Sequence, residues 1–169
     1  MINQQKIKYK YKSSGLWAAF FWVINMYKLS NRSLQRLYGV NCSLANVVKR
    51  AIQITNQDFM ITEGVRSREQ CCINYGKGRT VQQCSQKGIP VKYAQPNLSK
   101  VTWLNNPYAS KHVTGKAVDL VPYPVDWTDL NKFQTIALAM KQAAAELGVK
   151  IIWGGDWKTS KDYPHFEIL

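Results

Sequence analysis

The sequence predicts an α+β fold in which a small antiparallel sheet has helices packed on one side and leaves its other face open. Three features favour this class: one long amphipathic helix, several short strands, and no regular alternation of strand and helix. The chain has 169 residues, of which 46% are hydrophobic and 20% charged, enough for one domain with a substantial core. We expect that domain over residues 29–169, after an extension over residues 1–28.

The extension combines a basic stretch with an apolar one. Lysines alternate with other residues over positions 6–12, and a mostly apolar run follows over positions 15–27. The run lacks an Ala-x-Ala cleavage site after it and is shorter than the ~20 residues of a membrane-spanning helix. The sequence leaves four interpretations open: a signal peptide, an interfacial helix, a signal anchor, or a helix packed on the domain.

Two helices are expected next. Ser30 or Asn31 can cap a short helix that ends at Gly39. Ser43 can cap a second helix, because apolar residues recur after it at helical spacing. Its expected apolar face consists of Leu44, Val47, Val48, Ala51, Ile52 and Ile54.

A strand, a helix and a long loop are expected in the middle of the chain. Residues 59–62 are apolar and predict a buried strand. Ser67, followed by Glu69-Gln70, indicates the start of a third helix. Residues 76–108 contain repeated glycine, proline and asparagine turn signals, so we expect this stretch to be mostly loop.

The second half of the chain has the strongest patterns. Residues 117–121 predict a strand in which Asp119 lies on one face with two small or apolar neighbours. Asp129 opens the best helix, which Gly148 ends. Its apolar positions are Leu130, Phe133, Ile136, Ala137, Met140, Ala144 and Leu147. Residues 150–153 and 165–169 are the closing strands.

The charge balance indicates polyanionic partners. A formal net charge of +13 attracts nucleic acid, anionic lipid or bacterial wall polymers. A nucleic-acid binder is disfavoured, because no recognition motif accompanies the charge. We interpret the four cysteines as mostly reduced, and Cys71, Cys72 and Cys84 lack the spacing of a zinc knuckle.

The two histidines of the chain each lie near a carboxylate. His112 precedes Asp119 by seven residues, and His165 follows Asp162 by three. Two imidazoles and one carboxylate make an open zinc site that keeps a position for water. Asp162 is then suited to act as general base on that water. Taken singly, each pair also fits a simpler explanation, a surface loop for the first and an Asx turn for the second.

These residues form a motif that resembles a known family. The pattern Ser110-x-His112-x-x-Gly115-x-Ala117-x-Asp119, joined to Asp162-x-x-His165, is similar to the zinc peptidases that cut bacterial wall stem peptides. Those are the D-alanyl-D-alanine carboxypeptidases and dipeptidases, and the chain more closely resembles their phage endolysin branch, the L-alanyl-D-glutamate endopeptidases. Further stretches carry this resemblance at residues 33–40, 63–66, 75–80, 101–103 and 153–157.

The resemblance implies specific roles. His112, Asp119 and His165 would bind one zinc ion, and Asp162 would be the catalytic carboxylate. Arg66 matches the arginine that stabilises the polarised carbonyl, a role that preorganised charge performs well. Arg68 lies two residues further on and competes for this role. Many relatives have glutamate where this chain has Asp162, so its base is one methylene shorter.

Other residues near the motifs receive weaker interpretations. Ser110, Trp153 and Trp157 are expected to support the ligands or line the substrate cleft, as are Trp103 and Tyr108. Asp156 is interpreted as a structural or supporting residue. Glu167 shares a strand face with His165 and either orients that imidazole or faces solvent.

The predicted function is zinc-dependent endopeptidase, an endolysin that hydrolyses the L-alanyl-D-glutamate bond of peptidoglycan stem peptides. The alternatives are a D-alanyl-D-alanine carboxypeptidase and a non-catalytic, zinc-containing wall-binding module. We expect a monomer made in the bacterial host cytoplasm that acts on the cell wall. Residues 1–28 could add export or contact with an anionic membrane.

Overall fold

The computed structural model describes residues 27–169, and within them four strands form one antiparallel sheet in the order β1-β2-β4-β3. The strands are β1 (Phe59–Glu63), β2 (Ala117–Pro122), β3 (Ile151–Trp153) and β4 (His165–Ile168). Each lies within a residue or two of a predicted strand. The predicted α+β class with a small antiparallel sheet is confirmed.

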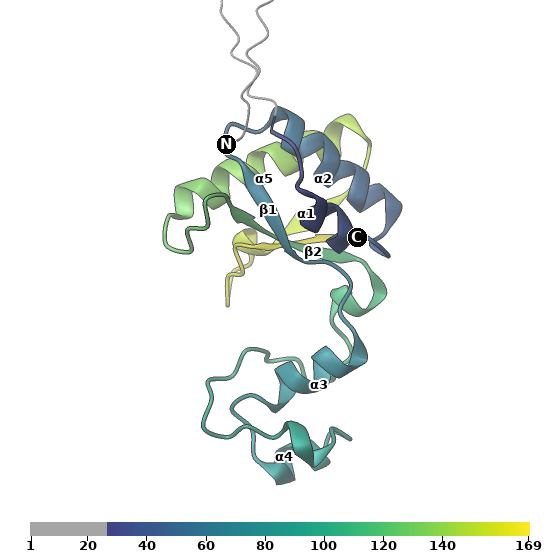
Figure 1. Cartoon of the computed structure of the whole chain (residues 1–169), viewed down its shortest axis with the longest axis vertical. Coiled ribbons are helices and arrows are strands. Elements are labelled where there is room, and N and C mark those ends of the chain that lie inside the picture. Colours follow the sequence, from purple (N-terminus) through teal and green to yellow (C-terminus); the bar gives the residue numbers. More distant parts are fainter. Residues whose placement is uncertain (1–26) are drawn as a thin grey trace, which may run out of the picture.

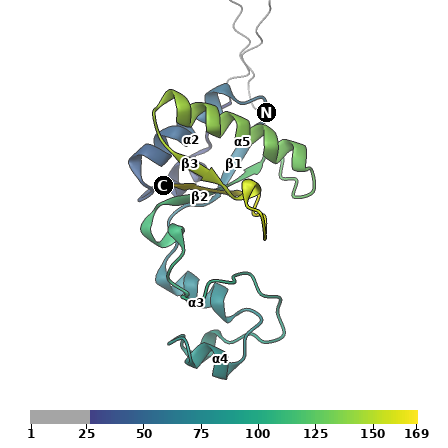
Figure 2. The same cartoon turned by 180° about the vertical axis from the view of Figure 1, so that it is seen from behind.

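Three helices pack with this sheet to form the body of the molecule. They are α1 (Asn31–Arg36), α2 (Cys42–Ile54) and α5 (Leu130–Glu146). Figures 1 and 2 show α2 and α5 lying side by side over the sheet. Their apolar faces meet the strands in one large core, to which α2 contributes Leu44, Val47, Val48, Ala51 and Ile52 and α5 contributes Phe133, Ile136, Ala137, Met140, Ala143 and Ala144.

The helices agree with the predictions except at three points, which concern a cap, a helix end and the burial of two leucines. Asn41, not Ser43, caps α2, because its side-chain oxygen accepts from the backbone N–H groups of residues 43 and 44. Helix α1 ends at Arg36, and the chain turns before it reaches Gly39. Leu130 and Leu147, expected on the buried face of α5, are about half exposed because they lie at its two ends.

Strand β2 is central and separates two chemical environments. Val118 and Leu120 are completely buried in the body core. Because side chains alternate along a strand, Asp119 points to the opposite, open face of the sheet. The register places Asp119 beside Glu63 of β1 and His165 of β4. Polar groups from three strands therefore meet on the open face.

Residues 68–109 form a second region, called the lobe here. It contains α3 (Arg68–Gly76), α4 (Val81–Ser85) and the short 3-10 helix η1 (Val91–Tyr93). Both views show α3 and α4 at the opposite end of the molecule from α2 and α5. The prediction of a mostly loop segment is wrong at α4, where Thr80 and Gln83 form a reciprocal capping box.

The lobe has a small core and depends on individual polar contacts. Its buried cluster consists of Cys72, Tyr75, Cys84 and Ile89. The buried guanidinium of Arg79 donates to the carbonyl oxygens of Tyr75 at 2.6 Å and Thr102 at 2.7 Å. This side chain ties α3 to a loop that has no regular structure.

The predictions for the extension fall mostly outside the described residues. Tyr27 and Leu29, at the start of the described part, pack against the body core. No helix within residues 27–169 is long and apolar enough to cross a membrane.

Candidate metal centre

His112 reaches the open face of the sheet from η2 (Lys111–Thr114), the 3-10 helix that follows the lobe. Ser110 caps this turn, and Gly115 ends it at a φ of 67°, a left-handed conformation that favours glycine and directs the chain into β2. The His112 side chain is 2% exposed. Its Nδ1 lies 2.8 Å from the carbonyl oxygen of Gly64, an acceptor, so Nδ1 carries the proton and Nε2 presents its lone pair.

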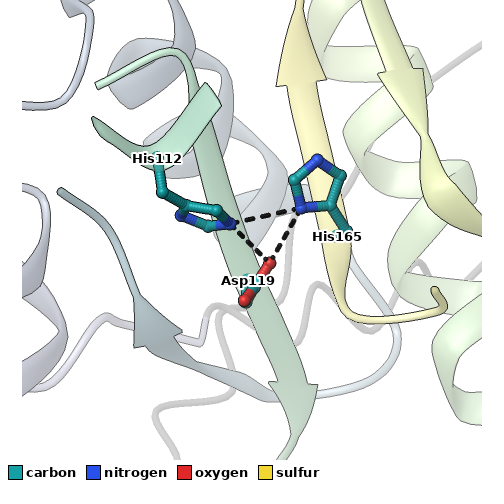
Figure 3. Close-up of side chains that lie close together, drawn as sticks. All are labelled: His112, Asp119 and His165. Carbon is teal, nitrogen blue, oxygen red and sulfur yellow. Dashed lines mark hydrogen bonds and ion pairs between the residues drawn. The ribbon is translucent and has the colours of Figure 1, made fainter. Parts of the chain in front are cut away.

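The three predicted metal ligands converge. His112 Nε2 lies 3.2 Å from Asp119 Oδ1, and His165 Nδ1 lies 3.2 Å from that same oxygen. The two ring nitrogens are also 3.2 Å apart. Figure 3 shows the two rings and the carboxylate pointing toward one another from η2, β4 and β2. One ligand atom from each residue lies within 4.8 Å of the others, so the group could hold a metal ion.

The environment keeps the central carboxylate ionised. Burial alone would raise the pKa of Asp119, but the interactions of its carboxylate with the imidazoles of His112 and His165 outweigh burial and hold this pKa well below its usual range. Burial likewise disfavours the charged form of His165, yet its contacts with Asp119 and Glu167 raise its pKa overall. A negative charge fixed between two imidazoles is a favourable place for a cation.

Asp162 lies in the loop that enters β4. Its backbone N–H donates to Gly154 at 3.1 Å, and its carbonyl accepts from the N–H of His165 at 3.2 Å. A side chain at Gly154 would collide with the Asp162 backbone, so glycine permits this close approach. Burial, together with the charge of Asp119, raises the pKa of Asp162. This is the environment expected of a carboxylate that exchanges protons.

Arg66 is held rigidly at the end of β1. Its Nε and Nη2 donate to the two carboxylate oxygens of Glu63 at 2.6 and 2.5 Å, and Nη1 donates to Ser110 Oγ at 3.3 Å. Burial would lower the pKa of Arg66, but the Glu63 contact raises it. Arg68, the competing candidate, instead lies over the ring of Tyr108 at 4.2 Å.

The other candidate residues are distributed around this group. The Trp157 ring lies 5.3 Å from that of His165. Trp153 is buried in the body core, where its indole N–H donates to the carbonyl of Tyr163 at 2.7 Å and so supports the Asp162 loop. Asp156 is exposed and pairs with Lys141 at 2.7 Å. Trp103 is exposed on the lobe.

Sequence reasoning missed two contributors to the site. Glu63 fixes Arg66, and its signal was the three-residue separation of two opposite charges at the end of a strand. The Gly64 carbonyl fixes His112, and a backbone acceptor has no signal in the sequence. Glu167, which the sequence left undecided, lies with its Oε2 3.2 Å from His165 Nε2.

The donor set fits a divalent metal. Both imidazoles have their outward nitrogen opposite an oxygen acceptor, so the nitrogens that face Asp119 have free lone pairs. Two imidazole nitrogens and one carboxylate oxygen are the ligands of an open zinc site. The residues can therefore hold zinc and leave a position for a reacting water.

Comparison with known proteins gives a consistent result. The family model described as phage L-alanyl-D-glutamate peptidase matches residues 25–94 and 87–168. The L-alanyl-D-glutamate peptidase of Escherichia phage T5 is 33% identical over 84% of this chain and 89% of its own length. The peptidoglycan L-alanyl-D-glutamate endopeptidase CwlK of Bacillus subtilis (strain 168) is 31% identical over 74% of this chain and 69% of its own.

A solved structure agrees with these relatives. The crystal structure of the Serratia marcescens L-Ala D-Glu endopeptidase ChiX aligns with a TM-score of 0.60 and 30% identity, covering 86% of this chain and 92% of that one. Both parts of the chain, body and lobe, are thus included in the similarity. The chain belongs to the phage L-alanyl-D-glutamate peptidase family.

Proposed function

We propose that this protein is a zinc-dependent endopeptidase that hydrolyses the L-alanyl-D-glutamate bond of bacterial peptidoglycan stem peptides. Family membership supports the bond and the substrate, since the T5 and Bacillus subtilis relatives carry that activity in their names. The convergence of His112, Asp119 and His165 carries the mechanism. These three residues are proposed to bind one zinc ion.

Bound zinc would polarise the scissile carbonyl and acidify the attacking water. Asp162 accepts a proton from this water as its oxygen adds to the alanine carbonyl carbon. The same carboxyl then gives the proton to the glutamate nitrogen as the C–N bond breaks. Its raised pKa suits both steps, because a pKa closer to neutrality makes the carboxylate a better base toward water and still lets the carboxyl group give the proton to the leaving amine.

Arg66 is proposed to stabilise the oxyanion that forms when water adds. The two bonds to Glu63 and one to Ser110 hold its guanidinium in one orientation. A cation fixed before the reaction begins needs no reorganisation when negative charge develops. Arg68 is less suited to this role, since its guanidinium is stacked on Tyr108.

The protein is proposed to act on the wall of the bacterium in whose cytoplasm it is made, as a monomer. Its net charge of +13 favours adsorption to anionic wall polymers. Residues 1–28 are proposed to contact anionic membrane, since lysines precede an apolar run there. Vesicles with and without anionic lipid would test this contact, and equal binding of the full chain to both would contradict it.

The decisive experiment is digestion of purified peptidoglycan with and without a metal chelator, followed by mass spectrometry of the fragments. The proposal requires new D-glutamate amino termini that chelator abolishes and added zinc restores. Release of terminal D-alanine would indicate a carboxypeptidase instead. Binding to walls without fragments or loss of turbidity would indicate a non-catalytic module.

A further inference from the structure

The two histidines of the metal centre face Asp119 with different ring nitrogens. His112 uses Nε2, because its Nδ1 is engaged by the Gly64 carbonyl at 2.8 Å. His165 uses Nδ1, and its Nε2 lies 3.2 Å from the Glu167 carboxylate. Each imidazole therefore has its own acceptor on the side away from Asp119. One acceptor is part of the backbone, and the other is a side chain that mutation can remove.

Glu167 is placed for this contact by the sheet. It follows His165 by two residues on β4, so both side chains are on the same face. Its register partner on β2 is the small residue Ala117. The Glu167 side chain is 17% exposed, and within residues 27–169 His165 is its recorded hydrogen-bond and ion-pair partner.

We propose that Glu167 is a positioning residue that keeps the proton of His165 on Nε2 and directs Nδ1 toward the metal. This inference rests on the proposed zinc site. An ionised carboxylate accepts from Nε2–H, which fixes both the tautomer and the rotation of the ring. It also makes Nδ1 a stronger donor to a cation. The predicted effect is on metal affinity, which can be measured without any substrate.

Two substitutions separate the parts of this role. Glu167→Ala removes the acceptor and should weaken zinc binding by about 10- to 100-fold, the usual consequence of losing such a partner. Glu167→Gln keeps an acceptor oxygen of the same reach but loses the charge, so its loss should be smaller. Glu146→Gln is the matched control, because Glu146 is exposed on α5 and pairs with Arg50.

The test is competition for zinc between a chromophoric chelator and the metal-free full-length proteins. The inference requires the affinity order wild type and Glu146→Gln, then Glu167→Gln, then Glu167→Ala. Wild-type affinity in both Glu167 variants would overturn it. If Glu167→Ala does not fold, Glu167→Gln decides alone, and wild-type affinity there would overturn the inference. Absence of zinc binding by the wild type would instead refute the proposed function.

Imidazole ¹⁵N NMR gives a readout that a purely structural role would not change. The chain has two histidines, so two rings account for the spectrum. In the zinc-loaded protein one ring should carry its proton on Nδ1 and the other on Nε2. The Nε2 proton of His165 should exchange with water faster in Glu167→Ala than in the wild type. Equal exchange rates, or two rings protonated on the same nitrogen, would contradict the assignment.

Discussion

The body and the lobe are stabilised in different ways. The body buries a continuous apolar core between α2, α5 and the sheet. The lobe has a much smaller cluster and relies on contacts such as those of Arg79 with two carbonyl groups. All three proposed metal ligands follow the lobe in sequence and lie on or next to the sheet. The chemistry is thus positioned by the region with the larger core.

The connection between the two regions passes through the site. Two segments link body and lobe, residues 64–67 and 110–116, and they are hydrogen-bonded to each other. The Arg66 N–H donates to the His112 carbonyl at 3.1 Å, in addition to the contact of His112 Nδ1 with Gly64. His112 and Arg66 therefore hold the two linking segments together at the base of the lobe. Substitutions can separate the chemical contribution of the body from the supporting contribution of the lobe.

The largest effect is expected from the body residues that bind metal. His112→Ala, Asp119→Ala and His165→Ala each remove one of three ligands, so we expect loss of bound zinc and of wall hydrolysis. Zinc content of the purified proteins and clearing of a peptidoglycan suspension measure the two effects. Circular dichroism should remain that of the wild type. Stoichiometric zinc in any of these variants would contradict the assigned ligand set.

Asp162→Ala should retain zinc and lose turnover. A general base contributes about 10²- to 10⁴-fold to the rate, and the three ligands are untouched by the change. The kcat for a defined stem peptide is the appropriate measurement. Asp156→Asn is the comparison, because that exposed carboxylate pairs with Lys141 and should leave kcat unchanged. Full wall-degrading activity of Asp162→Ala would refute its role as base.

A smaller effect is expected at the border between the two regions. Glu63→Gln replaces the carboxylate that holds Arg66 by two bonds, so the guanidinium loses its fixed orientation. Misplacement of a positioned group by about 1 Å can cost up to ~10²-fold in rate. Zinc affinity should change little, because the Glu63 carboxylate is bonded to Arg66 and to none of the three ligand side chains. Arg66→Lys should lower kcat by as much or more, since lysine cannot make the two parallel hydrogen bonds that the guanidinium makes with Glu63. Wild-type kcat in Glu63→Gln would show that this anchor is dispensable.

The same contrast explains which features the sequence predicts. The helix after Asp129 and the strand around Asp119 are predicted almost to the residue, because periodic burial leaves a periodic sequence. The ligand set is predictable because the chain has two histidines, each close to a carboxylate. Helix α4 and the hydrogen bonds of Arg79 could not be predicted, because they depend on single contacts such as that between residues 79 and 102. The backbone carbonyl that accepts from His112 could not be predicted for the same reason.

The smallest effect on hydrolysis is expected from the lobe core, and a matched pair of isoleucines isolates it. Ile89 in the lobe is 2% exposed and Ile136 in the body is 1% exposed. Replacing a buried isoleucine by alanine costs about 2 to 5 kcal/mol, more where surrounding atoms cannot close the cavity. In denaturant unfolding, the loss of unfolding free energy should therefore be near the upper limit of this range for Ile136→Ala and near the lower limit for Ile89→Ala.

Hydrogen exchange would locate each loss within the molecule. Ile89→Ala should accelerate exchange mainly at amides of residues 68–109, because a region with few buried contacts opens locally. Ile136→Ala should accelerate exchange throughout the body. Zinc affinity should survive Ile89→Ala, because the ligands lie outside the lobe. If Ile89→Ala destabilised body and lobe equally and also released zinc, the two regions would unfold as one unit, and the metal centre would depend on the lobe as much as on the sheet.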